Sequence, residues 1–509
     1  MDTLRSGVPE ITRRDFLKTA GASLAFLGLS KTLTPPVAKA LEEYAGKTSA
    51  IKGKPNILWI VMDTARADHV SCYGYHRRTT PNIDRIASEG VLFEKAFATA
   101  PWTLPSHASM FTGTFPARNG TDAEHLRLDG RFHTVAEVLR SQGYRTHAYT
   151  NNVVVGSSLA QGFDIYERTN KGLDPKVGPE LVDSLKINEA RRYLEEFLLM
   201  DDGAYGTNKV AKGWIAEAHQ DGEPFFVFIN YMEPHRSYGR IPAPYDTLYL
   251  DENVDRATVR ELANGVRNKN TRNYNAGTVQ INAEEFGILR ALYDGEISYL
   301  DFRIGQLYNY LRELEVLDNT ILIMTSDHGE NFGEHGLMGH QLCVYDTLLH
   351  VPLIIRHPRS FKAGLRLDKQ VQLIDIFPTI LDITGIEWEG RKELQGHSLI
   401  EGTRQDIPRL VIAEHGIWYG VLDTSRKLNP GLDLTAYARR LKAVRTEQSK
   451  YIWASDGKDE LYDIDRDPHE LNNLIDTYPE KARELKTLLV EWLNSFETYR
   501  PWTPKEIAR

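Results

Sequence analysis

Apolar runs alternate with segments of helical periodicity along most of the chain. The run NILWIVM, which follows Pro55, predicts a buried strand with Asp63 at its carboxyl end. The runs PFFVFINY and TILIMTS have the same character, and polar residues follow each of them. Between such runs apolar residues return every three or four positions, as at Ile83, Ile86 and Ala87, which indicates an amphipathic helix. The alternation predicts an α/β fold with a large, mostly parallel sheet between helices.

The pattern changes near residue 404. Short apolar segments within RLVIAEH, LKAVRTEQSKYIWA and DELYDI are typical of antiparallel strands. The last long segment, YPEKARELKTLLVEWLNSF, has the spacing of an amphipathic helix. We therefore predict a catalytic domain at residues 50–403 and a smaller α+β subdomain at residues 404–509.

The stretch at residues 240–287 interrupts this organisation, because it is polar and without clear periodicity. We interpret it as an irregular insertion in the catalytic domain. Two roles are open for it: a cap over the functional site, or a surface excursion that does not contact substrate.

The N-terminus has the features of an export signal. Arg13 and Arg14 precede a short apolar run, and Ala38-Lys39-Ala40 supplies a small-x-small cleavage site. This arrangement resembles a twin-arginine signal, so we expect residues 1–40 to be removed and the mature chain to be periplasmic or extracellular. The alternative is a basic segment on an amphipathic helix. No later segment approaches about 20 consecutive apolar residues, so we expect no transmembrane anchor.

The net charge limits the expected binding partners, and the cysteine content limits the expected disulfide bonds. The 509 residues carry a formal net charge of −9, which gives no electrostatic reason to expect binding to nucleic acid. Cys72 and Cys343 are the two cysteines, and we interpret both as buried small apolar side chains, although an oxidising compartment would permit one bridge. The sequence carries no signal for the oligomeric state.

Residues capable of metal binding follow three of the predicted segments. Asp63 ends the first strand, Asp327 and His328 end a later one, and Thr103 lies in a proline-containing loop that leads into a helix. Two carboxylates, an imidazole and a hydroxyl form a mixed oxygen and nitrogen ligand set for one divalent metal. Asp68-His69 is also a potential ligand pair, but no buried strand leads into it, so we interpret it as structural.

At this point the chain resembles the sulfatase branch of the alkaline phosphatase superfamily. The resemblance covers nearly all of the sequence after the export signal. It implies an alkaline-phosphatase-like sandwich, hydrolysis of an ester bond, one divalent metal ion, and a small-molecule or glycan ester as substrate. The motifs that carry it are, in order, NILWIVMDTARADHVSCYGY, WTLPSHASMFTG, YMEPH, TSDHGENFGEHGLMGH, VPLIIRHP, IDIFPTILDITGI, LQGHSLI and ELYDIDRDPHELNNL.

The nucleophile loop departs from the sulfatase pattern. Sulfatases place a cysteine or serine there and convert it to formylglycine, whereas this chain has Thr103, followed by Leu-Pro-Ser-His, with Thr112 and Gly113 in register. A threonine has no second hydroxyl with which to expel sulfate by elimination, so its covalent ester requires direct attack by water. Direct attack of water on the covalent ester is a route well suited to phosphate and phosphonate esters. The loop is also similar to the Thr-x-Pro-Asn-His loop of nucleotide pyrophosphatase/phosphodiesterases, which use a threonine nucleophile.

The metal ligands depart from the family as well. The sulfatase Asp-Asp pair is here Asp63-Thr64, and the common Asp-Asn pair is Asp327-His328. Loss of one carboxylate and gain of one nitrogen ligand favours zinc or manganese over calcium.

Two other positions also depart from the residues found in related families. The Lys-x-His motif of sulfatases falls at Asn152 and Val154. The phosphodiesterases hold a second zinc with an aspartate and a histidine four residues later, and this chain has His235 but Gly239 at the second place. We therefore expect one metal ion and not two.

Several side chains near these positions have more than one open role. His235 and His340 match family positions near the transferred group, where each is either a general acid for the leaving group or an orienting residue. His107 either bonds Thr103 or braces the backbone, and Asn152 either binds a substrate oxygen or is structural. Ser106 is the rival hydroxyl to Thr103, but its place in the family loop favours a supporting role.

These features together predict an exported, metal-dependent hydrolase of phosphate or phosphonate esters with Thr103 as nucleophile. One alternative is a sulfuric ester hydrolase that works without formylglycine. Another is a metal-containing pseudoenzyme that binds sulfated or phosphorylated glycans, although a binding protein has little need of a nucleophilic hydroxyl among its ligands. A phosphoethanolamine-type transferase is a further alternative, but such relatives usually carry a membrane anchor.

Overall fold

The structure is a computed structural model that describes residues 53–152, 154–168, 201, 203–235, 238–239, 241–268, 270–402, 409–431 and 437–499. The predicted export signal at residues 1–40 lies outside these residues. Within them, no helix combines the length and the apolar character that a membrane span requires.

The centre of the fold is a large sheet that is mostly parallel, as the sequence predicts. Only β9 runs antiparallel to its neighbours among these strands. The expectation of an α/β fold is therefore confirmed. The strands are, in spatial order, β10 (Leu365–Gln372), β2 (Val91–Phe97), β9 (His350–Arg356), β6 (Thr320–Thr325), β1 (Asn56–Met62), β5 (Phe225–Tyr231), β3 (Arg145–Thr150) and β4 (Ile165–Arg168).

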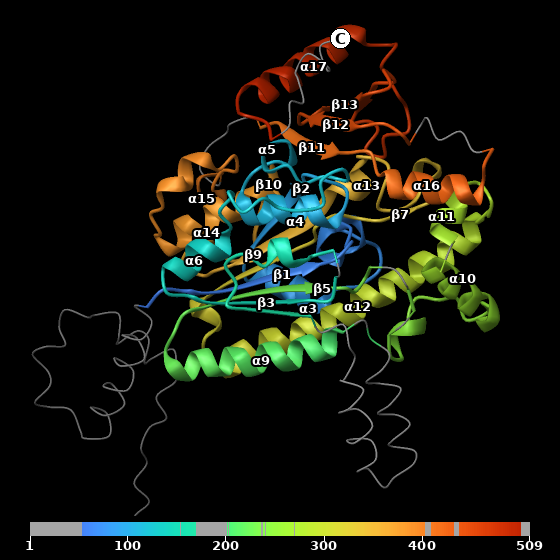
Figure 1. Ribbon diagram of the computed structural model, residues 1–509. Helices are drawn as coiled ribbons and strands as arrows, with labels where there is room; N and C mark the ends of the chain where they lie inside the picture. Colours follow the sequence, from blue (N-terminus) through green and yellow to red (C-terminus); the bar gives the residue numbers. More distant parts are fainter. Residues whose placement is uncertain are drawn as a thin grey trace, which may run out of the picture. The chain divides into compact units, whose positions relative to one another are not determined.

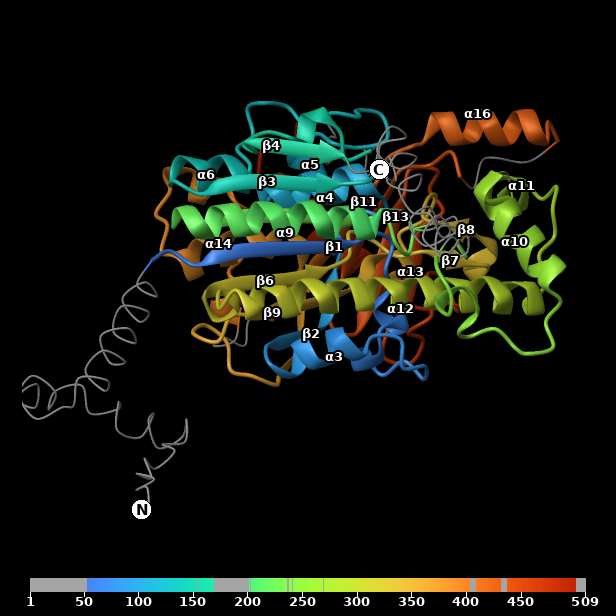
Figure 2. The ribbon, with the colours of Figure 1, turned by 90° about the horizontal axis from the view of Figure 1, so that it is seen from below.

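Helices cover both faces of this sheet (Figures 1 and 2). Because side chains alternate along a strand, Trp59 of β1 packs into one core and Ile60 into the other. The Trp59 face is covered by α4 (Thr103–Thr112), α6 (Val135–Ser141) and α14 (Ile376–Thr384). The Ile60 face is covered by α3 (Pro81–Ser88), α9 (Ala204–Asp221) and α12 (Ala283–Glu313).

A second sheet forms from the C-terminal part of the chain, where the sequence predicts antiparallel strands. Helix α17 (Pro479–Asn494) packs on it through Leu485 and Leu489. The α+β character predicted for this segment is confirmed, while the boundary predicted at residue 404 lies outside the described residues. The strands are β11 (Val411–His415), β12 (Leu441–Arg445), β13 (Ser449–Ala454) and β14 (Glu460–Asp463), all antiparallel to their neighbours.

The stretch at residues 240–287 is not irregular as predicted, because much of it is helical. It contains α10 (Arg256–Asn268) and α11 (Asn270–Asn275), and α12 begins at Ala283. Val259, Leu262 and Ala263 have helical spacing and join a core formed with distant parts of the chain, and the helix was missed because polar residues dominate the stretch around them.

This insertion reaches the segment that carries His340. Strands β7 (Asn331–Phe332) and β8 (Met338–Gly339) form a small hairpin that ends just before that residue. The side chain of Asn275 donates to the Met338 carbonyl oxygen at 2.9 Å and accepts from the Met338 N–H at 2.9 Å. The insertion therefore braces an element of the candidate site.

Candidate metal centre and nucleophile

The candidate residues lie at the carboxyl ends of neighbouring parallel strands. Strands β6, β1, β5 and β3 are adjacent in the sheet and run in one direction. Asp327 and His328 follow β6, Asp63 follows β1, and Asn152 follows β3. The carboxyl edge of an open α/β sheet is where ligands usually bind, so the topology alone brings these side chains to a common place.

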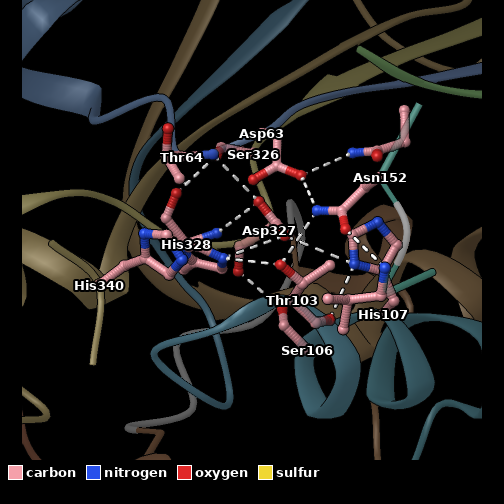
Figure 3. Close-up of polar contacts among 12 residues, drawn as sticks. Asp63, Thr64, Thr103, Ser106, His107, Asn152, Ser326, Asp327, His328 and His340 are labelled. Carbon is pink, nitrogen blue, oxygen red and sulfur yellow. Dashed lines mark hydrogen bonds and ion pairs between the residues drawn. The ribbon is translucent and has the colours of Figure 1, made fainter. Parts of the chain in front are cut away.

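Asp63, Asp327 and His328 form a compact buried cluster (Figure 3). Each offers one ligand atom, these atoms lie within 4.8 Å of one another, and none of the three residues has exposed surface. Thr103 begins α4 beside them, and its Oγ1 lies 3.3 Å from His328 Nε2. The structure thus brings together the four residues that the sequence predicts as metal ligands.

Burial and neighbouring charges shift the pKa values of all three residues in the cluster. Burial, together with the negative charge of Asp327, raises the pKa of Asp63 to about 8. Burial alone would raise the pKa of Asp327, but the charge of His328 outweighs it and holds that pKa below its ordinary value. Burial opposes charge on His328 as well, yet Asp327 raises its pKa to about 9. Two buried carboxylates at this distance repel each other unless a cation or a proton lies between them.

The cluster fits a divalent metal ion. Asp63 Oδ1 and Asp327 Oδ2 are buried and accept no hydrogen bond. His328 Nδ1 lies 3.0 Å from the Gly329 carbonyl oxygen, and donation at this atom leaves Nε2 as the ligand atom. Two carboxylate oxygens, an imidazole nitrogen and a hydroxyl are donors suited to zinc or manganese.

An amide network holds Asp63 and Thr103 in place. Asn152 Nδ2 donates to Asp63 Oδ2 at 2.6 Å and lies 3.3 Å from Thr103 Oγ1. Asn230 Nδ2 approaches the same Asp63 oxygen at 3.4 Å, and its own carbonyl oxygen accepts from the Thr150 hydroxyl at 3.1 Å. Asn152 therefore contacts both the carboxylate and the candidate nucleophile.

The two other polar residues of the α4 loop brace the backbone. Ser106 Oγ donates to the Asp327 carbonyl oxygen at 2.7 Å. His107 Nδ1 lies 2.9 Å from the Thr103 carbonyl oxygen and 3.5 Å from Asp327 Oδ2, and burial lowers its pKa. These contacts place Ser106 behind the cluster and His107 beside it.

Three histidine rings form a row at one side of the cluster. The His340 ring centroid lies 4.6 Å from that of His328 and 4.9 Å from that of His235. His340 Nδ1 lies 3.2 Å from a carboxylate oxygen of Glu330. His340 is thus oriented by an acid, and His235, which is half-buried, lies on its outer side.

The pair Asp68-His69 lies outside the cluster. Asp68 pairs with Arg66 at 2.7 Å, and His69 Nδ1 lies 2.6 Å from Asp294 Oδ1. Among the residues that the structure describes, the one group of three or more acids, histidines or cysteines placed to hold a metal is that of Asp63, Asp327 and His328. Asp68 thus makes a structural ion pair, and His69 makes a structural hydrogen bond.

Two further residues of the site, Asn230 and Glu330, were not predicted from the sequence. Asn230 is a polar residue in the otherwise apolar end of β5, FINY, and this interruption is a signal that could have found it. Glu330 follows Asp327 by three residues, within the motif already quoted, but only the hairpin fold shows that it faces His340.

Comparison with known proteins gives the family. A family model described as Sulfatase matches residues 55–386, and one described as N-sulphoglucosamine sulphohydrolase, C-terminal, matches residues 333–498. An arylsulfatase of Clostridium perfringens is 27% identical over 87% of this chain and 95% of its own length. An N-acetylglucosamine-6-O-sulfatase of Bacteroides thetaiotaomicron is 25% identical over 96% of this chain and 94% of its own length.

The fold of this chain is similar to that of a solved hydrolase structure. The crystal structure of a phosphonate monoester hydrolase of Agrobacterium radiobacter matches with a TM-score of 0.67 at 22% identity, over 87% of this chain and 96% of that one. Enzymes of this family are metal-dependent, and the buried cluster offers a place for the ion. The chain therefore belongs to the sulfatase family of the alkaline phosphatase superfamily, a family of hydrolases that act on ester bonds.

Proposed function

We propose that the chain hydrolyses phosphate or phosphonate esters with Thr103 as the covalent nucleophile. The observation that carries this proposal is the position of Thr103 Oγ1, 3.3 Å from His328 Nε2, at the edge of the cluster of Asp63, Asp327 and His328. A buried hydroxyl beside two carboxylates and an imidazole is placed to react and to share a metal ion.

The metal site supports a transition metal more than calcium. Asp63, Asp327, His328 and Thr103 would hold the ion, and the nitrogen ligand favours zinc or manganese. When bound, the ion would lower the pKa of the neighbouring hydroxyl and balance the charge of the carboxylates and the ester.

The remaining residues have roles that follow from their contacts. The Thr103 hydroxyl loses its proton to solvent and Oγ1 attacks phosphorus, the bond from phosphorus to the leaving oxygen breaks, and protonated His340 or His235 gives that oxygen a proton. Glu330 orients His340 for this transfer. Asn152, whose amide bridges Asp63 and Thr103, is placed to donate to a non-bridging oxygen of the ester. Water then attacks the phosphorus of the threonine ester and the bond to Oγ1 breaks. The water oxygen and one hydrogen leave with the phosphorus acid, and the other hydrogen restores the Thr103 hydroxyl.

A sulfuric ester hydrolase without formylglycine is the competing function. The names of the curated relatives, an arylsulfatase and an N-acetylglucosamine-6-O-sulfatase, favour sulfate esters. Thr103 argues against sulfate ester hydrolysis. A threonine sulfate has no second hydroxyl with which to expel sulfate, so it is hydrolysed only by attack of water at sulfur.

A panel of 4-nitrophenyl esters distinguishes hydrolysis of phosphate or phosphonate esters from hydrolysis of sulfate esters. The chain loaded with zinc or manganese should turn over the phosphonate monoester or the phosphodiester faster than the sulfate. Thr103→Ala should lower kcat by at least about 10³-fold, because it removes the two-step route. Ser106→Ala is the matched control, and its effect should be much smaller. Rapid multiple turnover of the sulfate with inert phosphoesters would refute the proposal.

We also propose that the mature enzyme works outside the cytoplasm. The support is the sequence alone: Arg13-Arg14, the apolar run after it, and the small-x-small site ending at Ala40. Replacement of both arginines by lysine should retain the full-length precursor in the cytoplasm, as cell fractionation and the N-terminal sequence of the product would show. Unimpaired export of the double variant would contradict the assignment.

A further inference from the structure

A closed ring of hydrogen bonds passes through Asp63. It includes Thr150, the last residue of β3, which pairs in register with Asn230 of the neighbouring strand β5. The Thr150 hydroxyl donates to Asn230 Oδ1 at 3.1 Å and accepts from the Asn152 N–H at 3.1 Å. The side-chain nitrogens of Asn230 and Asn152 then meet at one carboxylate oxygen, Asp63 Oδ2, at 3.4 and 2.6 Å. Thr150 therefore connects the two amides that contact Asp63.

The members of the ring are buried. Thr150, Asn230 and Asp63 have no exposed surface, and Asn152 is 4% exposed. A buried polar group that loses its partner is not compensated by bulk solvent, so each member of the ring depends on the others. The ring therefore fixes the orientation of its side chains more firmly than the same contacts would at the surface.

The Thr150 hydroxyl gives the ring one direction. It receives the Asn152 N–H on one lone pair, and its single hydrogen is directed to Asn230 Oδ1. If the Asn230 amide turned over, its nitrogen would face Thr150 Oγ1 and the hydroxyl hydrogen would lose this acceptor. The carbonyl oxygen of Asn230 would then face the carboxylate oxygen of Asp63, and the two would repel each other. The hydroxyl thus keeps the amide nitrogen of Asn230 turned towards Asp63.

The Asn152 amide is oriented by a different contact. Its Oδ1 accepts from the Val154 N–H at 2.8 Å, so its Nδ2 faces Asp63 and lies 3.3 Å from Thr103 Oγ1 (Figure 3). Thr150 supports this residue through the main chain, because the Thr150 hydroxyl accepts from the Asn152 N–H. One hydroxyl therefore supports both donors to Asp63 Oδ2.

The consequence concerns the other carboxylate oxygen. Asp63 Oδ1 is buried and accepts no hydrogen bond. Because two amides hold Oδ2, rotation of the carboxylate is restricted, and Oδ1 is the oxygen left for a cation. Contacts of this kind, from residues that do not touch the ion, set the orientation of metal ligands in proteins.

We propose that Thr150 is a positioning residue for the metal centre, whose hydroxyl fixes the Asp63 carboxylate so that Oδ1 faces the ion. Thr150 acts through Asn230 and Asn152 and is not itself a ligand. The inference rests on the metal site of the proposed function, and it depends neither on the identity of the nucleophile nor on that of the ester.

Calorimetric titration with zinc and with manganese, after a chelator has removed bound metal from the full chain, tests the proposal without substrate. Thr150→Val keeps the β-branched shape but removes the hydroxyl, and it should weaken binding of the ion by at least about 10-fold. Thr150→Ser keeps the hydroxyl and should stay within about 3-fold of the parent. If Thr150→Val does not fold, Thr150→Ala, which lacks the same hydroxyl without adding bulk, should show the same loss.

Thr146→Val is the matched control. Thr146 lies on the same face of β3 as Thr150, has no exposed surface, and donates its hydroxyl to the Gly162 carbonyl oxygen at 2.7 Å. It is near the amino end of the strand, whereas the cluster is at the carboxyl ends. Both valine variants should lower the Tm of the metal-free chain, because each loses a buried hydrogen bond. Only Thr150→Val should weaken metal binding, and Thr146→Val should stay within about 2-fold of the parent.

A double-mutant cycle tests the route through Asn230. Asn230→Ala should weaken zinc binding by about 10-fold, since it removes one donor to Asp63 Oδ2. In Thr150→Val/Asn230→Ala the loss should stay well short of the about 100-fold that two independent effects would give, because either change alone opens the ring. A combined loss equal to the product of the single losses would show that Thr150 does not act through the ring.

The outcomes separate this inference from the proposed function. Equal metal affinity in Thr150→Val and the parent would overturn the role of Thr150 alone. An equal loss in Thr146→Val, or a Thr150→Ser variant as weak as Thr150→Val, would do the same. Failure of the parent chain to bind either ion would overturn the metal site of the proposed function and this inference with it.

Discussion

Single residues in this site are held by unusually dense polar contacts. Asp63 receives the Asn152 amide, faces Asn230, and still keeps one oxygen without a donor. Burial and the charge of Asp327 raise the pKa of Asp63, while the charge of Asp327 is balanced by His328. A divalent cation between the two carboxylates relieves their repulsion, so the metal and the fold of these residues depend on each other.

Removal of Asp327 tests this dependence. Asp327→Ala should lose bound zinc or manganese and, with it, the rise in Tm that either ion gives the parent chain. Metal analysis of the purified protein and a thermal melt with added ion measure both effects. Asp68→Ala removes a nearby carboxylate that pairs with Arg66 instead, and it should keep the metal. Retention of metal by Asp327→Ala at the parent's affinity would contradict the ligand assignment.

At the scale of elements, the long helix α12 supports the loop that follows β1. The Tyr293 hydroxyl donates to the Thr64 carbonyl oxygen at 2.7 Å and accepts from the Arg66 N–H at 2.9 Å. Thr64 is buried and has a φ of 63°, a left-handed conformation that a β-branched residue rarely adopts. Its N–H lies 3.3 Å from Asp327 Oδ1, so the conformation links the two strand ends that carry the carboxylates.

Tyr293→Phe should therefore weaken both the fold and the metal site. Loss of one hydroxyl leaves a buried carbonyl and a buried N–H without a partner, and the free energy of unfolding should fall by about 1–3 kcal/mol. Metal affinity should fall by about 10-fold, since the supporting contact of a ligand-bearing loop is lost. Tyr310→Phe on the same helix, whose hydroxyl bonds the Lys212 carbonyl oxygen, should leave metal affinity unchanged in calorimetry. Equal affinities in the two variants would contradict the supporting role.

The sequence predicts the elements that bury continuous apolar runs and misses those whose stability comes from distant contacts. Strands β1, β5 and β6 follow directly from such runs, and Asp63 and Asp327 follow from their ends. Helix α10 was missed because polar residues dominate the stretch around its apolar ones, and the core that these meet is assembled from remote segments. Glu330 was missed for a related reason: its partner His340 is ten residues away, across a hairpin that the pattern does not reveal.

At the scale of the whole molecule, buried ion pairs join the small sheet to the catalytic sheet. Lys450 of β13 has no exposed surface and contacts Asp346 at 2.7 Å and Glu470 at 2.6 Å. Asp346 begins α13 (Asp346–Leu349), which leads directly into β9.

Lys450→Met should lower the free energy of unfolding by about 3–5 kcal/mol, because it leaves the buried Glu470 without its cation and Asp346 with Arg445 alone. Urea denaturation monitored by circular dichroism measures the change. Lys481→Met removes a lysine that pairs with Glu484 on the exposed face of α17, and its effect should stay within about 0.5 kcal/mol. A similarly small change in Lys450→Met would show that the buried pairs do not hold the sheets together.

The identity of the nucleophile is tested most directly by the mass of the peptide that contains Thr103. The chain should be quenched with acid during turnover of a slowly hydrolysed phosphoester, then digested and sequenced by mass spectrometry. We expect one phosphoryl group on Thr103, present only with substrate and metal, and absent from Thr103→Ala and from the neighbouring Ser106 in every sample. A phosphoryl group on Ser106, or full turnover with no modified peptide at any quench time, would contradict the account.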